Sequence, residues 1–154
     1  LNGVVGTTTG GFYVWGVNRG TGTAGFSSLG LDGVLFDSVV IVRPNGASQV
    51  IVGGVPTTLG SGINFSGNTL SALVSGSLLP STGFAPSQYT INLWPRTAST
   101  LSNGAVGGNA AISDFAPNNS NVLVTTTAPE PGSLTLAMLG GLTVAGTILR
   151  RRRA

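Results

Sequence analysis

The stretch VVIVRPNGASQVIV, residues 39–52, carries the clearest structural signal in this chain. Two runs of β-branched residues, 39–42 and 50–52, lie on either side of the segment RPNG at 43–46. Proline at the second position of a turn, followed by Asn-Gly, is typical of a tight reversal between antiparallel strands. The stretch therefore predicts a β-hairpin.

The residues around this hairpin predict more strands of the same kind. Ser66-Gly67-Asn68 forms a second turn signal, and in the run 69–74 that follows it, apolar residues alternate with polar ones and share one face. The chain contains 25 glycines and many Ser and Thr residues, which disfavour helices and favour short strands joined by turns. We expect strands at 12–17, 34–42, 48–52, 63–65, 69–74, 89–94 and 122–127.

A short motif narrows the architecture. Phe84-x-Pro86-x-x-Tyr89 opens the alternating run after residue 89 and resembles the tyrosine corner of immunoglobulin-like and fibronectin-like sandwiches. The resemblance implies that the Tyr89 hydroxyl bonds the backbone of the preceding turn. We therefore expect residues 1–127 to form one all-β domain, an antiparallel immunoglobulin-like β-sandwich, with a partly open barrel as the alternative. The Gly-, Asn- and Ser-rich stretch 96–120 is expected to be a long loop with a short strand near 110–112.

The last 27 residues have a different organisation, in three consecutive parts. Residues 128–132 hold Pro129-Glu130-Pro131, residues 133–149 are 17 residues without a charge, and four arginines follow at 150–153, within the terminal segment 150–154. An α-helix of 17 residues is about 26 Å long, close to the hydrocarbon thickness of a bilayer. The uncharged run therefore predicts a single transmembrane helix.

The arginine block predicts the orientation of that helix. Arginines beside a membrane segment favour the cytoplasmic side, so Arg150, Arg151, Arg152 and Arg153 are expected inside and residues 1–127 outside. Two prolines fix the backbone around Glu130 and keep it extended. The tail thus presents one acidic side chain on an extended peptide just outside the membrane.

This combination closely resembles the PEP-CTERM sorting signal of bacteria. It implies that Pro129, Glu130 and Pro131 are recognised by an exosortase-type membrane protease. It also implies export, transient anchoring in the inner membrane, and delivery to the cell surface or extracellular matrix. The resemblance covers the 27-residue tail alone, and the alternative is an ordinary C-terminal anchor behind an incidental proline-rich linker.

The charges and the start of the chain bear on the same hypothesis. The net charge of +3 comes from the tail, because three arginines balance three aspartates in residues 1–127 and there is no Lys. The domain therefore has no basic stripe for nucleic acid, and none is expected as a partner. The chain begins at Leu1 without the basic and apolar regions of a secretory signal, so we expect that signal to have been removed or to lie outside this sequence.

The residue inventory argues against an enzyme. The chain has neither His nor Cys, which excludes the usual nucleophilic triads and most zinc sites, and we expect no cofactor and no metal. Asp32 and Asp37 are a possible glycosidase-like carboxylate pair. Asp32 lies in a Leu-Asp-Gly turn and Asp37 in an apolar run, so we expect turn-forming and solvated or backbone-bonded roles instead.

Two further groups of residues suggest ligands. Asp114, Asn118, Asn119 and Asn121 offer oxygen atoms to calcium, although their spacing favours Asx-type turns that satisfy their own backbone. Trp15 and Trp94 would stack on sugar rings if both indoles were exposed. The domain would then be an exopolysaccharide-binding module carrying the same sorting signal, whereas buried indoles would belong to the core.

Overall fold

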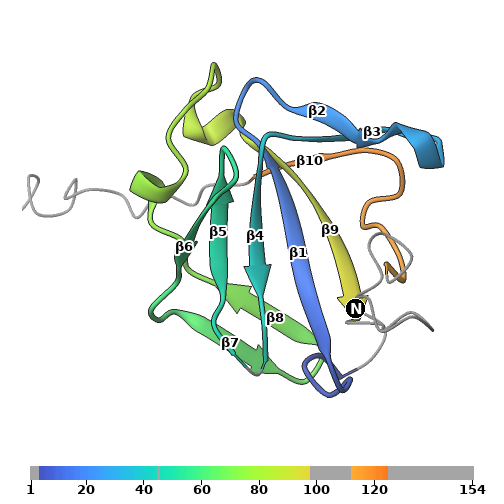
Figure 1. Cartoon of the computed structure of the whole chain (residues 1–154), viewed down its shortest axis with the longest axis vertical. Coiled ribbons are helices and arrows are strands. Elements are labelled where there is room, and N and C mark those ends of the chain that lie inside the picture. The colour runs from blue at the N-terminus through green and yellow to red at the C-terminus, as the bar shows by residue number, and fades with distance from the viewer. Residues whose placement is uncertain (1–3, 45, 98–111, 125–154) are drawn as a thin grey trace, which may run out of the picture. The chain divides into compact units, whose positions relative to one another are not determined.

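The computed structural model describes residues 4–44, 46–97 and 112–124, and over these residues every strand pairing is antiparallel (Figure 1). The strands are β1 (Gly11–Asn18), β2 (Thr23–Phe26), β3 (Leu31–Phe36), β4 (Ser38–Val42), β5 (Gln49–Val52), β6 (Val55–Thr58), β7 (Ile63–Ser66), β8 (Thr69–Ala72), β9 (Thr90–Thr97) and β10 (Val122–Leu123). The described helical segments are three short 3-10 turns, η1 (Ser27–Leu29), η2 (Gly76–Leu78) and η3 (Pro86–Gln88). The all-β prediction is confirmed.

The main sheet has the strand order β10-β9-β1-β4-β5-β6. Its centre is β1, which pairs with β9 from Gly11↔Thr97 to Asn18↔Thr90 and with β4 on its other side. β2–β3 and β7–β8 form separate two-stranded ribbons. A long central strand with partners on both edges is the element about which the rest of the domain packs.

Both predicted hairpins are present. β4 and β5 pair from Ser38↔Val52 to Ile41↔Gln49, as the two apolar runs require. β7 and β8 pair down to Ser66↔Thr69, which leaves Gly67 and Asn68 as a two-residue turn. Gly67 has a φ of 56°, a left-handed conformation that glycine adopts without steric cost.

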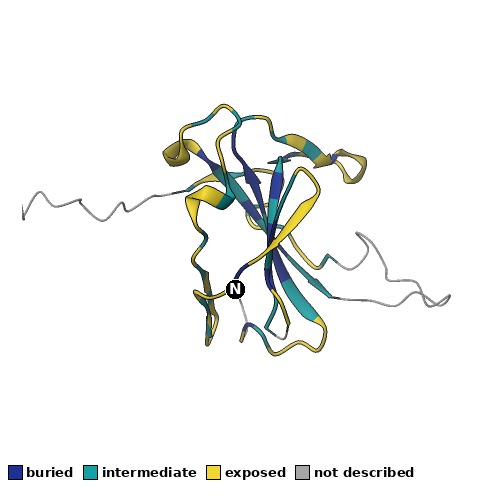
Figure 2. Ribbon diagram, turned by 60° about the vertical axis from the view of Figure 1, so that its left-hand side comes forward, coloured by how far each residue is buried: buried dark blue, intermediate teal, exposed yellow. Residues whose placement is uncertain are grey.

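The two ribbons pack against opposite faces of the main sheet. Alternate residues of β1 point to opposite sides of that sheet, and each side has its own core. On one face Val17, Val40, Val42, Val50, Leu59 and Tyr89 form a core that receives residues of β7 and β8. On the other face Val14, Phe26, Val34 and Trp94 form a second core that receives residues of β3. Figure 2 shows the buried residues gathered along the middle strands of the sheet.

The layers differ from those of an immunoglobulin-like domain, which divides its strands between sheets of three and four. Here the described strands form one sheet of six and two ribbons, so antiparallel sheets in layers are present but the immunoglobulin-like strand order is not seen among them. The Tyr89 hydroxyl does bond upstream backbone, donating to the Leu79 carbonyl at 3.0 Å. Its partner is ten residues earlier, beyond the η3 turn that immediately precedes Tyr89.

Several strand boundaries differ from the prediction. The run 34–42 is two strands, β3 and β4, because the chain passes at Asp37 from a ribbon into the main sheet. β2 and β6 were not predicted, and β6 carries a proline and is exposed along its whole length, as expected of an edge strand. Near 110–112, the described Ile112 forms a single bridge with Arg96.

The predicted sorting motif at 128–132, the membrane helix at 133–149 and the arginine tail at 150–154 lie outside the described residues. Within the described ranges, we find no helix that is both long enough and apolar enough to cross a membrane.

Candidate functional site

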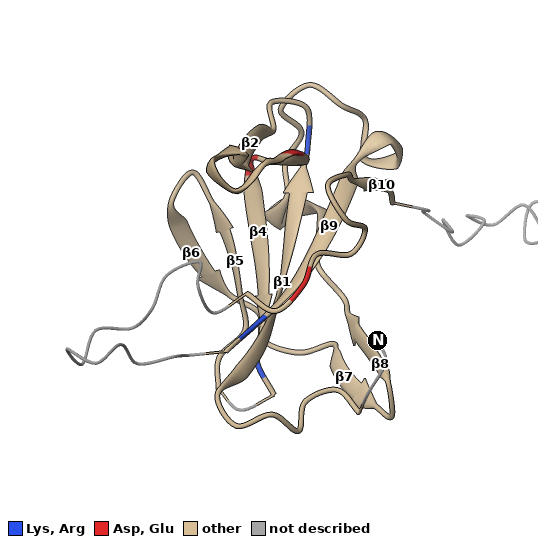
Figure 3. Ribbon diagram, turned by 90° about the vertical axis from the view of Figure 1, so that its right-hand side faces the viewer, with Lys and Arg blue, Asp and Glu red and all other residues tan. Residues whose placement is uncertain are grey.

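The charged residues of the described domain are few, and one pair of them is buried (Figure 3). Arg19 follows the end of β1, and Asp37 lies between β3 and β4. The Arg19 Nε donates to Asp37 Oδ1 at 2.7 Å, and the two side chains are 4% and 10% exposed. We call Arg19, Thr21, Asp37 and Thr82 the Asp37 cluster.

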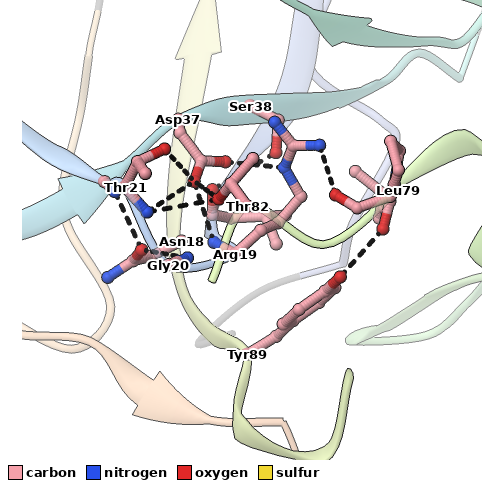
Figure 4. Close-up of polar contacts among 12 residues, drawn as sticks. Asn18, Arg19, Gly20, Thr21, Asp37, Ser38, Leu79, Thr82 and Tyr89 are labelled. Carbon is pink, nitrogen blue, oxygen red and sulfur yellow. Dashed lines mark hydrogen bonds and ion pairs between the residues drawn. The ribbon is translucent and has the colours of Figure 1, made fainter. Parts of the chain in front are cut away.

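The second oxygen of Asp37 accepts the four other hydrogen bonds that this carboxylate receives (Figure 4). The backbone N–H of Arg19 donates to Oδ2 at 3.1 Å and that of Thr21 at 3.3 Å. The hydroxyls of Thr82 and Thr21 donate to the same oxygen at 2.9 and 3.3 Å. Both carboxylate oxygens are therefore fully engaged with groups of the protein itself.

Arg19 connects this cluster to the segment before Tyr89. Its Nη1 donates to the carbonyl of Pro80 at 2.6 Å, and its own carbonyl accepts from the backbone N–H groups of Thr82 and Phe84. The Tyr89 hydroxyl holds the same segment at Leu79. The cluster thus attaches a long connection, which crosses between β8 and β9, to the end of the central strand.

The electrostatics of Asp37 follow from these contacts. Burial raises the pKa of Asp37, but the hydrogen bonds from the Arg19 side chain, from Thr82 and from the backbone of Arg19 and Thr21 outweigh burial, so the pKa lies below 3.8. The carboxylate is ionised at neutral pH and has no proton to give. This geometry suits a structural ion pair rather than a general acid or base.

Asp32 does not join Asp37 in a site. It lies in β3 rather than in a turn, where its side chain is exposed, whereas Asp37 is bonded into the cluster. The expectation that Asp37 bonds backbone is confirmed for the N–H groups of Arg19 and Thr21. The sequence analysis missed the ion pair with Arg19, because the two residues are 18 positions apart and nothing local links them.

Three of the four residues considered for calcium use their side chains in other contacts. Asp114 Oδ1 accepts from the N–H of the next residue, Phe115, at 2.8 Å, a local contact but not the Asx-type turn, which bonds the backbone two residues on. Asn119 Oδ1 accepts from Gly33 N–H at 2.8 Å, and the Asn121 side chain bonds both the N–H and the carbonyl of Leu35. These asparagines fasten the segment before β10 to β3. Over the described ranges, no three residues of His, Cys, Asp or Glu are grouped as metal ligands would be.

The two tryptophans do not form a sugar-binding platform. Trp94 is 2% exposed and meets Phe26 edge-on at 5.1 Å, while half-buried Trp15 packs against the core on the opposite face. A side chain at Gly16 would come within 2.5 Å of the indole of Trp94, which explains the glycine in the middle of β1. The observation that motivated a tryptophan-based polysaccharide site is therefore contradicted.

Sequence reasoning also missed a row of side chains across three adjacent strands. The guanidinium carbons of Arg43 and Arg96 lie 5.4 and 5.7 Å from the centroid of the Phe12 ring, within cation–π distance. Phe12 stands opposite Arg96 in the register of β1 and β9. This row lies beside the start of β1, whereas the Asp37 cluster lies beside its end.

A groove adjoins Arg43. It has a volume of about 630 Å³ and runs between the β4–β5 connection and the β6–β7 connection. The backbone N–H of Leu59 donates to the Ser48 carbonyl at 2.8 Å and joins the two walls. Of the described residues that line it, Arg43 alone is charged.

Comparison with protein-family models, with curated proteins and with solved structures found no match to this chain.

Proposed function

We propose that this chain is a non-enzymatic surface or extracellular-matrix protein whose C-terminal tail is a sorting signal for an exosortase-type membrane protease. The β domain is the exported cargo. Residues 133–149 anchor it transiently in the inner membrane, Arg150 to Arg153 stay in the cytoplasm, and Pro129-Glu130-Pro131 is the element that the enzyme binds.

One observation carries this proposal, the order of the three parts in the last 27 residues. A proline-flanked acid, an uncharged run of membrane length and a terminal arginine block each have a separate physical role, namely recognition, insertion and orientation. An incidental linker would require neither these three parts nor this order. Glu130 is the single Glu of the chain, so the motif offers one charge that a basic group of the enzyme can bind.

The described domain supports a cargo role through the way its polar groups are used. The buried carboxylate of Asp37 is held in an ion pair, and exposed Asp32 lies in another part of the fold. The asparagines before β10 bond the backbone of β3. Asp37 and these asparagines maintain the fold through internal contacts, which leave them unsuited to catalysis.

Intact-mass analysis of the protein recovered from its native host tests the proposal, because the mass reports both termini. We expect the surface-localised form to lack the residues that follow the processed bond near Glu130. When the exosortase gene is deleted, we expect this shortened form to disappear. A surface form that retains Arg150 to Arg153 would contradict it.

A further inference from the structure

The groove beside Arg43 has the composition of a small-molecule site. Its volume of about 630 Å³ lies in the range of ligand pockets, which combine an apolar surface with a few placed polar groups. Ile63 and Phe65 supply apolar surface, and exposed Ser61 supplies a hydroxyl, whereas Leu59 and Ser48 are buried behind them. None of these residues was singled out as a site by the sequence.

Arg43 is held in place before any ligand arrives. Its Nη1 donates to the Ala47 carbonyl at 3.0 Å, its backbone N–H donates to the Ser48 hydroxyl at 3.0 Å, and its guanidinium lies over the Phe12 ring. These contacts engage one guanidinium nitrogen and leave Nε and Nη2 without a hydrogen-bond partner among the described residues. A guanidinium held in this way loses little conformational freedom when it binds.

The charge of the groove selects an anion. Among the described residues of the lining, Arg43 is the one that carries a charge, and none is Asp or Glu. The guanidinium presents parallel N–H groups that match the two oxygens of a carboxylate. A single positive charge balances a carboxylate, whereas a phosphate monoester would bring a second negative charge that nothing in the lining neutralises.

The rest of the lining selects the body of the ligand. The apolar surface of Ile63 and Phe65 fits the C–H face of a ring, and the exposed Ser61 hydroxyl fits a hydroxyl group at its rim. A hydrocarbon chain would cover the Ser61 hydroxyl and offer it no partner, at a cost in free energy. We propose that this groove binds a carboxylated sugar ring, such as a uronic acid residue, with Arg43 holding the carboxylate. This site uses neither tryptophan and is independent of the sorting signal.

The test is a titration of the full chain, purified in mild detergent, with tri-galacturonate, followed by NMR shifts of the Gly60 to Phe65 amides. Neutral galactotriose and glucose 6-phosphate are titrated in parallel. We expect tri-galacturonate to bind with the highest affinity and to shift these amides, and its affinity to fall as salt is added. The absence of binding at millimolar concentrations, or equal binding of either comparison sugar, would overturn the proposal.

Two variants of Arg43 test whether this residue binds the carboxylate of the ligand. Arg43→Gln should weaken tri-galacturonate binding about ten- to hundredfold, and Arg43→Lys, which keeps the charge without the fork, should lie between that variant and the wild type. Arg96→Gln is the matched control, because Arg96 contacts the same Phe12 ring but does not line the groove, and its binding should be unchanged. Wild-type affinity in a folded Arg43→Gln protein, or an equal loss in Arg96→Gln, would contradict a carboxylate contact at Arg43.

Discussion

The β domain and the C-terminal tail use charge in different ways. In the domain, Arg19 and Asp37 are buried together and every oxygen of the carboxylate is bonded within the fold. In the tail, one Glu and four arginines are separated by an uncharged run of membrane length. The role of the domain's charges depends on the residues that they contact in the folded structure. The proposed role of the tail's charges depends instead on their order in the sequence. Removing a charge from the domain should therefore change its folding stability, whereas removing the charges of the tail should change membrane orientation or processing.

The largest effect is expected from replacing Arg150 to Arg153 by alanine. Without the arginines, the proposed membrane helix would lose its positive-inside bias, so a cytoplasm-dependent reporter fused after Ala154 should lose most of its activity. The folding stability of the β domain should not change. Wild-type reporter activity in this variant would remove the distinction between the two regions.

In the domain, Asp37→Ala should cost about 3 to 5 kcal/mol of unfolding free energy, because it leaves the Arg19 guanidinium buried without its counter-charge. Urea unfolding at neutral pH measures the loss. Asp32→Ala is the control, and the exposed position of Asp32 predicts a change within about 0.5 kcal/mol. Equal effects at the two positions would show that burial of the pair is unimportant.

The same ion pair predicts a dependence of stability on acid. The pKa of Asp37 is lower in the folded state than the 3.8 of the free side chain. The contribution of its carboxylate to the free energy of unfolding is therefore complete well above pH 3.8. It is lost as the pH falls below 3.8 and through the folded value. Thermal unfolding followed across this window should show a step that Asp37→Asn lacks. A step of equal size in the variant would mean that other groups cause it.

A smaller loss is expected at Tyr89. Tyr89→Phe removes the hydrogen bond to the Leu79 carbonyl and should cost about 0.5 to 1.5 kcal/mol. Denaturant midpoints at neutral pH are sufficient to measure it. A midpoint equal to that of the wild type would show that the Asp37 cluster alone holds the connection between β8 and β9.

The hairpins were predictable because their signals are local. The turn signal at 43–46 lies between two continuous apolar runs, and Ser66-Gly67-Asn68 precedes an alternating run; these signals lead to the observed pairings of β4 with β5 and β7 with β8. The division of 34–42 into two strands was not predictable, because the residues on both sides of Asp37 are equally apolar. What separates them is the tertiary bond network that Asp37 makes with Arg19.

The candidate site residues could not be predicted from the sequence either, because their contacts are tertiary rather than local. Nothing in the sequence links Arg43 to Phe12 or to the lining at 59–65, since strand pairing and two connections bring them together. The burial of Trp94 depends likewise on Phe26 and Phe115, which come from distant segments. The tail is the opposite case, because recognition, insertion and orientation are each assigned to a short continuous segment, and its proposed role rests on sequence order alone.

The most direct test of the sorting hypothesis is the substitution Glu130→Ala in a host that contains the exosortase. The substitution removes the one charge of the proposed recognition element and leaves both prolines, the uncharged run and the arginines in place. We predict normal membrane insertion and no processing, so that pulse-chase analysis shows the full-length protein accumulating in the inner membrane. Processing of the Glu130→Ala protein at the wild-type rate would contradict the account, because Pro129-Glu130-Pro131 would then be a linker.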